Sequence, residues 1–192
     1  MSARRLSRTL RATAAGLVVL AGAVSRTAAQ EPPPEAEIRS LSAECRGGHL
    51  LVSYHLQGGM TEVNLERLLG GLEVRFVHEL KVQTRRGLFG GATLLETTLE
   101  TTVTYDTLAK RWTLTRFRAG AQLDTRSADT ESEMRTFMET VQRVDLGEAP
   151  RTGHGVLRIK TAYQQGLLFM LLPWSYSATR DKDLDFEAMA CR

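Results

Sequence analysis

The chain has 192 residues with 25 basic and 22 acidic side chains, which gives a formal net charge of +3. Five arginines and no acidic residue fall in the first 29 residues, so the other 163 residues hold 20 basic and 22 acidic side chains and a formal charge of −2. This balance removes the support for a nucleic-acid partner, and the length suits one domain with a sizeable core.

The N-terminal segment has the pattern of a secretory signal peptide. Arginines up to Arg11 precede an apolar run at 12–24, and small residues end at Ala29. We expect cleavage after residue 29 (signal 1–29), a proline-rich linker at 30–37, one β-rich domain at 38–192, and a periplasmic or secreted protein. The alternative is a retained anchor, although its 13 apolar residues fall short of the roughly 20 that span a bilayer.

Alternating apolar residues, turn residues and helix caps predict the elements of the domain. In chain order we expect strands at 38–44 and 49–56, a helix at 61–69, strands at 72–83, 93–105, 111–118 and 122–126, a helix from 130 to about 143, a strand at 155–163, and a strand-like or loop segment at 181–186.

Three patterns decide most of these assignments. Gly47 and Gly48 predict a tight hairpin turn, and apolar residues alternate along both 49–56 and 72–83. Thr130 and Glu133 form a capping-box pattern at the start of the second helix.

Strands joined by short turns, without a regular β-α-β rhythm, indicate a mainly β fold. We expect an antiparallel sheet that forms a sandwich or an open barrel, with two short helices. A parallel nucleotide-binding sheet is disfavoured.

Cys45 and Cys191 are the only cysteines of the chain. In an exported protein they predict a disulfide, which would contribute on the order of 4 kcal/mol if it is unstrained. The alternative is two independent thiols. A catalytic thiol is not expected, because there is no Cys-x-x-Cys motif.

We find no catalytic, cofactor-binding or metal-binding motif in the sequence. His78 lies on the apolar face of the strand at 72–83, where it is either a core imidazole bonded to a hydroxyl or carbonyl group, or part of an unfamiliar hydrolytic site. His49 and His55 are roughly 20 Å apart on a strand, too far to share a metal.

The aspartates at 181, 183 and 185 resemble the start of a calcium loop, but the glycine and the final glutamate of such a loop are absent. We interpret them as a charged, solvated segment.

Two apolar segments are candidate partner-binding surfaces. The first lies at 85–91, where Arg85 and Arg86 flank Leu88 and Phe89 at a hairpin tip that could enter a membrane interface or a partner's groove. Its alternative is a loop that folds back onto the domain with the phenylalanine buried.

The second segment is residues 167–174, which include Phe169 and Trp174. Fully buried it is an ordinary strand; partly exposed, it would bind an apolar ligand or a protein.

The succession of elements resembles an exported bacterial family called domain of unknown function 4390. The resemblance rests on the early strand pair, the short helix that leads into 74–80, the basic loop at 85–89, and the turn at 105–108 followed by Trp112. It implies an extracytoplasmic domain without an assigned activity. Some members are encoded beside membrane sensor kinases, which implies an envelope-signalling partner. The cysteine pair is not part of this pattern.

Our leading hypothesis is a non-enzymatic envelope domain that binds a protein partner, a membrane surface or an apolar ligand, without a cofactor. The alternatives are a hydrolase with a site near His78 and a structural or assembly factor of the envelope.

Overall fold

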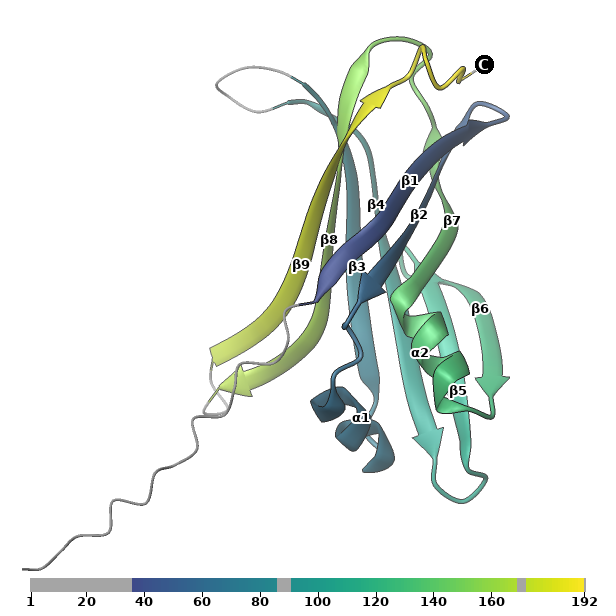
Figure 1. Ribbon diagram of the computed structural model, residues 1–192, viewed down its shortest axis with the longest axis vertical. Helices are drawn as coiled ribbons and strands as arrows, with labels where there is room; N and C mark the ends of the chain where they lie inside the picture. The colour runs from purple at the N-terminus through teal and green to yellow at the C-terminus, as the bar shows by residue number, and fades with distance from the viewer. Residues whose placement is uncertain (1–35, 86–90, 169–171, 192) are drawn as a thin grey trace, which may run out of the picture. The chain divides into compact units, whose positions relative to one another are not determined.

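The structure is a computed structural model that describes residues 36–85, 91–168 and 172–191, with the backbone alone for 164–168 and 172–174 (Figure 1). The described elements are β1 (Glu37–Arg46), β2 (His49–Gln57), α1 (Glu62–Leu69), β3 (Val74–Thr84), β4 (Thr93–Asp106), β5 (Arg111–Arg118), β6 (Ala121–Ala128), α2 (Glu131–Glu139), β7 (Thr140–Glu148), β8 (His154–Leu168) and β9 (Leu172–Asp185).

The strands form two antiparallel sheets, which confirms the mainly β fold with two short helices. One sheet has the order β1-β2-β7, and the other has the order β6-β5-β4-β3-β8-β9. The smaller sheet lies in front of the larger one in Figure 1, as in a sandwich, and the Nζ atom of Lys182 on β9 donates to the carbonyl oxygen of Leu41 on β1. The described strands of the two sheets do not join into a closed barrel.

The first hairpin follows the predicted turn chemistry. Arg46 pairs with His49, and both residues between them, Gly47 and Gly48, have positive φ angles of 58° and 80°. Such angles at both central positions define the type I′ turn, which matches the twist of the flanking strands and which glycine adopts without steric cost.

The sandwich interior is filled by side chains from both sheets and both helices. The alternating residues of β2 point inward as predicted, and each is at most 2% exposed. The larger sheet and α2 supply equally buried partners. Core side chains with an exposed fraction of 2% or less include Leu50, Val52, Tyr54, Leu56, Leu68, Phe76, Leu80, Leu99, Leu114, Met134, Phe137, Met138, Val141, Leu157 and Ile159.

The second helix begins as predicted but ends earlier. The Thr130 hydroxyl accepts from the Glu133 N–H and the Glu133 carboxylate accepts from the Thr130 N–H, which completes the capping box. The predicted continuation to residue 143 is wrong, because the chain leaves the helix at Thr140 and pairs with β2 as β7. Val141 fits the helical spacing and the inner face of β7 alike, so the periodicity hid the change.

The apolar segment at 167–174 is not one strand. Leu167 and Leu168 end β8, and the chain then returns as β9, where Leu172 pairs with Leu168 and Trp174 pairs with Gly166. Residues 169–171 lie outside the described residues. Most of the predicted segment at 181–186 belongs to the long strand β9, which ends at Asp185.

Candidate binding surface

The two surfaces predicted from sequence lie at opposite ends of the larger sheet. Thr84, just before the 85–91 loop, pairs with Gly155 at the beginning of β8, whereas the second segment starts at the end of β8. Twelve residues of extended strand separate Gly155 from Leu167, which is roughly 40 Å. The two segments therefore cannot form one site.

The first candidate is described only in part. The Arg85 side chain is 69% exposed and forms an ion pair of 3.3 Å with Asp183 on β9. Arg86, Leu88 and Phe89 lie outside the described residues. An exposed pair of this kind contributes little to stability.

The second candidate is also only partly described. Phe169 lies outside the described residues, and of Trp174 the structure gives the backbone at the start of β9.

His78 is a core residue, as one of the two interpretations predicted. Its side chain has no exposed surface, and its Nδ1 atom lies 2.9 Å from the Thr161 hydroxyl oxygen. The rings of Tyr54 and Phe76 pack edge to face against the imidazole, with distances between ring centres of 5.7 and 6.4 Å. Burial, with a smaller effect from the charge of Arg116, lowers the pKa of His78 to about 3, so the imidazole is neutral near pH 7.

Arg116 connects this polar part of the core to the second helix. Its Nη2 atom donates to the carbonyl oxygens of Phe137 (2.8 Å) and Thr140 (3.2 Å), at the C-terminal end of α2. The guanidinium also lies 4.4 Å from the centre of the Phe137 ring. Arg118 repeats the arrangement by donating to the Asp145 carbonyl oxygen of β7 at 3.0 Å. These two arginines therefore tie β5 to α2 and β7.

The aspartates of β9 have separate partners. Asp181 binds the Arg158 guanidinium with both carboxylate oxygens, at 2.9 and 2.8 Å, and this contact lowers the pKa of Asp181. Asp183 binds Arg85, and Asp185 accepts from main-chain N–H groups of the C-terminal turn. Within the described ranges, no three His, Cys, Asp or Glu side chains are grouped as a metal site would require.

Exposed apolar side chains gather at one end of the larger sheet, which we call the α1 end. Here β3 begins, β4 turns into β5 and β8 runs toward β9; α1 lies at this end in Figure 1. Among the described residues, five of the seven large apolar side chains that are exposed belong to this end. They are Val63 (41%), Leu69 (50%), Leu72 (56%), Leu108 (94%) and Tyr176 (41%).

The turn after α1 explains why Leu72 is exposed. The Gly71 N–H donates to the Leu68 carbonyl and the Leu72 N–H to the Arg67 carbonyl, at 2.8 and 2.9 Å, and Gly71 has a φ of 79°. This is a Schellman motif, in which the position of Leu72 usually makes an apolar contact with the last turn. Here the helix residues that would make this contact are Glu66 and Arg67, which are both charged. The strand predicted at 72–83 therefore begins two residues later, at Val74, and Leu72 is not part of it.

The apolar pattern of α1 was also misleading. The helix at 61–69 was predicted from the spacing of its apolar residues, but the side chains that α1 buries are Asn64 and Leu68, whereas Val63 and Leu69 are exposed. The two buried positions are four residues apart and share one face of the helix.

At the α1 end, β3 and β8 separate from each other, and we call the region between them the fork. Their described pairing stops at Val77 and Ala162, although β3 begins three residues earlier and β8 continues for six more. The register between β8 and β9 shifts at Tyr163, and a bulge of this kind bends a strand.

The side chain of Asn64 on α1 makes two hydrogen bonds inside the fork. Its Nδ2 atom donates to the Tyr163 carbonyl oxygen at 3.0 Å and to the Gly59 carbonyl oxygen at 3.2 Å. The side chain is 1% exposed, and its Oδ1 atom has no hydrogen-bond partner among the described residues. Because Nδ2 satisfies two carbonyls, the orientation of the amide is fixed and the unpartnered atom is an acceptor.

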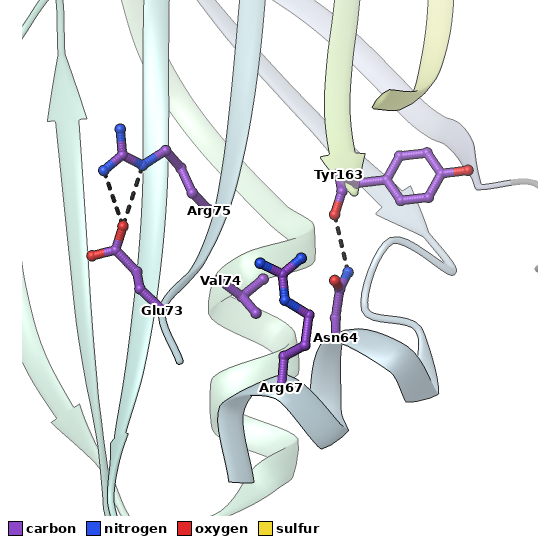
Figure 2. A pocket seen from close by; sticks show the side chains of 6 residues that line it. All are labelled: Asn64, Arg67, Glu73, Val74, Arg75 and Tyr163. Atoms are coloured by element: carbon purple, nitrogen blue, oxygen red, sulfur yellow. Dashed lines mark hydrogen bonds and ion pairs between the residues drawn. The ribbon is translucent and has the colours of Figure 1, made fainter. Parts of the chain in front are cut away.

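A hollow of about 210 Å³ lies next to this amide (Figure 2). In Figure 2 the Asn64 amide and the Arg67 guanidinium are turned toward the same space, and Arg75 is turned toward Glu73. The Arg75 guanidinium binds the Glu73 carboxylate at 3.0 Å and the Glu100 carboxylate at 3.3 Å. The lining residues are Asn64, Arg67, Glu73, Val74, Arg75 and Tyr163.

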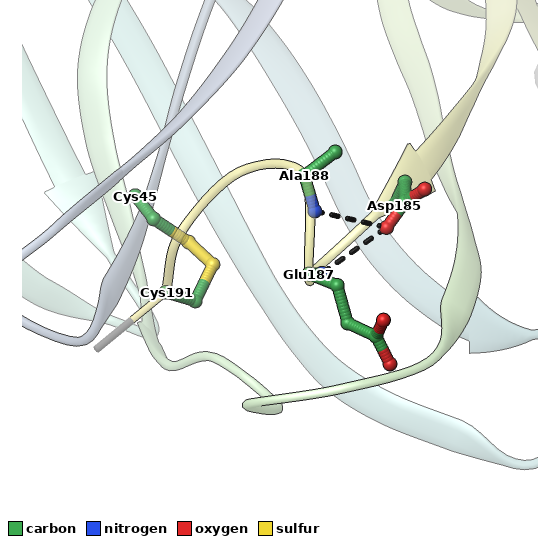
Figure 3. Close-up of a disulfide and its surroundings, with 5 residues drawn as sticks. All are labelled: Cys45, Asp185, Glu187, Ala188 and Cys191. Carbon is green, nitrogen blue, oxygen red and sulfur yellow. Dashed lines mark hydrogen bonds between the residues drawn. A yellow bond between two sulfur atoms is a disulfide. The ribbon is translucent and has the colours of Figure 1, made fainter.

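A larger hollow of about 530 Å³ lies at the opposite end, beside the disulfide. The predicted bond between Cys45 and Cys191 is present, with the Cα atoms 5.1 Å apart. Asp185 accepts from the N–H groups of Glu187 and Ala188, both at 3.1 Å, and the turn this forms brings the chain back toward β1 (Figure 3). Most of the exposed large apolar side chains of the described residues lie at the other end, so we place the candidate site at the α1 end.

Comparison with known proteins gives one match. The profile of a family described as a domain of unknown function, number 4390, matches residues 34–168, more than two thirds of the chain. The chain belongs to this family. No curated protein and no solved structure gave a significant match. The region matched by family 4390 includes α1 and the fork, and it stops before β9 and Cys191, so the disulfide links a matched residue to an unmatched one.

In this member of family 4390, the residues that shape the fork were not predicted from the sequence. Asn64 lies among the apolar residues of α1, and Tyr163 is the last residue of the strand predicted at 155–163. A polar residue on the face shared with Leu68 was the available signal. No helix in the described part of the chain is long and apolar enough to cross a membrane.

Proposed function

We propose that the protein is an exported, non-enzymatic domain that binds a protein partner through its α1 end. The observation that carries the proposal is the gathering of exposed apolar side chains there. A water-soluble surface rarely collects large apolar groups unless something covers them. The disulfide is compatible with an extracytoplasmic location.

The filled interior favours a protein over an apolar ligand. Side chains from both sheets occupy the space where a lipid-binding sandwich or barrel would hold its ligand. The hollow at the fork has about 210 Å³, less than the roughly 300–1,000 Å³ of sites that enclose small molecules. An open contact with another polypeptide fits these dimensions better.

The environment of His78 argues against the hydrolase alternative. A general base must lie within hydrogen-bond reach of the group that it deprotonates. His78 is fully buried between the sheets, where its Nδ1 atom contacts the Thr161 hydroxyl. A substrate could reach the imidazole only if the sandwich opened.

The test is co-purification from envelope extract with the full chain carrying a C-terminal tag. The double variant Leu69→Asp/Leu72→Asp should lose at least one partner that the wild type retains. Leu123→Asp on β6 is the matched control, because Leu123 is 50% exposed and lies away from the α1 end. Thermal unfolding of all three proteins checks that the substitutions do not unfold the domain.

Two outcomes would contradict the proposal. Capture of the same proteins by wild type and double variant would show that the α1 end binds none of them. Sedimentation of wild type, but not the double variant, with phosphatidylglycerol vesicles, together with no difference in captured proteins, would make the membrane the target.

A further inference from the structure

We infer that the partner of the α1 end is recognised as an extended peptide segment that adds a strand to the free edge of β3 inside the fork. This inference rests on the proposed function and names the form in which the partner binds. It follows from main-chain groups that the sheet leaves unpaired, from one buried acceptor, and from the exposed apolar side chains beside the hollow.

The free edge is at residues 74–76. Val74 pairs with Val103 of β4 on one side, but the described residues offer no strand partner on the other side until Val77 meets Ala162. Successive residues of a strand direct their N–H and C=O groups alternately to its two sides. At least one of these three residues therefore presents a donor and an acceptor to the fork.

The Asn64 amide supplies a second attachment point. Its buried Oδ1 atom has no partner among the described residues, and a buried acceptor left without a donor costs about 1–3 kcal/mol. A main-chain N–H of an incoming peptide is a suitable donor. Lipid tails offer neither this donor nor partners for the β3 edge, which favours a polypeptide over a membrane at this place.

The side chains around the hollow indicate which segments fit best. Arg75 is already paired with the Glu73 and Glu100 carboxylates, so the apolar neighbours of the hollow, and not its charges, select the segment. Beside the hollow, the exposed Leu69 and Leu72 can receive apolar side chains of the same segment. Strand addition of this kind takes its affinity from main-chain bonds and its specificity from alternate side chains.

The probe is a library of linear twelve-residue peptides displayed on phage and selected against the tagged full chain. Selected peptides should carry apolar side chains, and they should bind Leu123→Asp but not Leu69→Asp/Leu72→Asp. Each selected peptide is then resynthesised with a single N-methyl group at each position in turn, which removes one N–H at a time.

If the peptide forms a strand along β3, sensitivity to N-methylation alternates with a period of two. Methylation of an N–H that faces β3 should weaken binding by roughly tenfold or more, while the neighbouring positions change it little. The insensitive positions are the matched control, since they carry the same methyl group on the same peptide.

Other patterns overturn strand addition without touching the proposed function. Peptides that bind the α1 end with uniform or helical-period sensitivity would show another binding mode. Selection of no peptide, or of peptides that bind the double variant equally well, would show that linear segments are not recognised there. The co-purification experiment decides the proposed function separately.

Discussion

Removal of the disulfide should lower the stability of the domain by a large fraction. Cys45 and Cys191 are 146 positions apart in the sequence, and closing a loop of this length lowers the entropy of the unfolded chain enough to stabilise the fold by about 5 kcal/mol. Domains of this kind have total stabilities of about 5–15 kcal/mol. The variant Cys45→Ser/Cys191→Ser should therefore be marginally folded at room temperature.

Urea denaturation followed by circular dichroism measures the effect. With a slope of about 2 kcal/mol per molar urea, the midpoint should fall by roughly 2 M or more. Wild type under reducing conditions is the matched control, because it lacks the bond without a substitution, and it should unfold near the double variant. Midpoints of oxidised and reduced wild type that agree within about 0.2 M would refute the loop-closure argument.

Three further changes test the lowered pKa of His78, the N-terminal cap of α2 and the assignment of the core. The free energy of unfolding should fall as pH drops from about 6.5 toward 3, by up to about 1.4 kcal/mol per pH unit, because the unfolded chain takes up a proton at His78 and the folded core, with its lowered pKa, does not. The urea midpoint of His78→Asn should therefore fall less than that of wild type between pH 6.5 and pH 4. An equal fall of the two midpoints would contradict this. Thr130→Ala should cost about 1 kcal/mol by loss of the cap, against under about 0.5 kcal/mol for Ser132→Ala. Leu99→Ala, in the core, should cost about 2–5 kcal/mol, and Leu108→Ala, 94% exposed, almost nothing; similar melting shifts would refute the core assignment.

Most strands could be predicted because strict alternation reports burial directly. Along β2 and β3, the inward positions were apolar or, at His78, a side chain that found a hydroxyl partner in Thr161. Turn residues also predicted where strands begin and end, as Gly47 and Gly48 did for the start of β2. Such signals are local, and the local part of the fold was predicted well.

The errors came where one pattern fits two structures. Val141 suited a helix and a strand, and the pairing of β7 with β2, more than 80 residues away in the sequence, decided between them. Leu72 continued the alternation of β3, but the hydrogen bonds of the Schellman turn hold it outside the strand. In both cases contacts that no short window contains overruled the periodicity.

The candidate site could not be predicted for the same reason. The fork depends on the point at which β8 leaves β3 and on a bond between Asn64 and Tyr163, which are 99 positions apart. Side-chain types alone do not state which carbonyl a buried amide will meet.

The first and last residues that the structure describes lie at opposite ends of the domain. The Ala36 N–H donates to the Tyr163 hydroxyl beside the fork, whereas Cys191 closes the opposite end through its bond to Cys45. A binding experiment that holds the protein beside Cys191 therefore leaves the α1 end open to a partner, whereas one that holds it beside Ala36 places the support next to the fork.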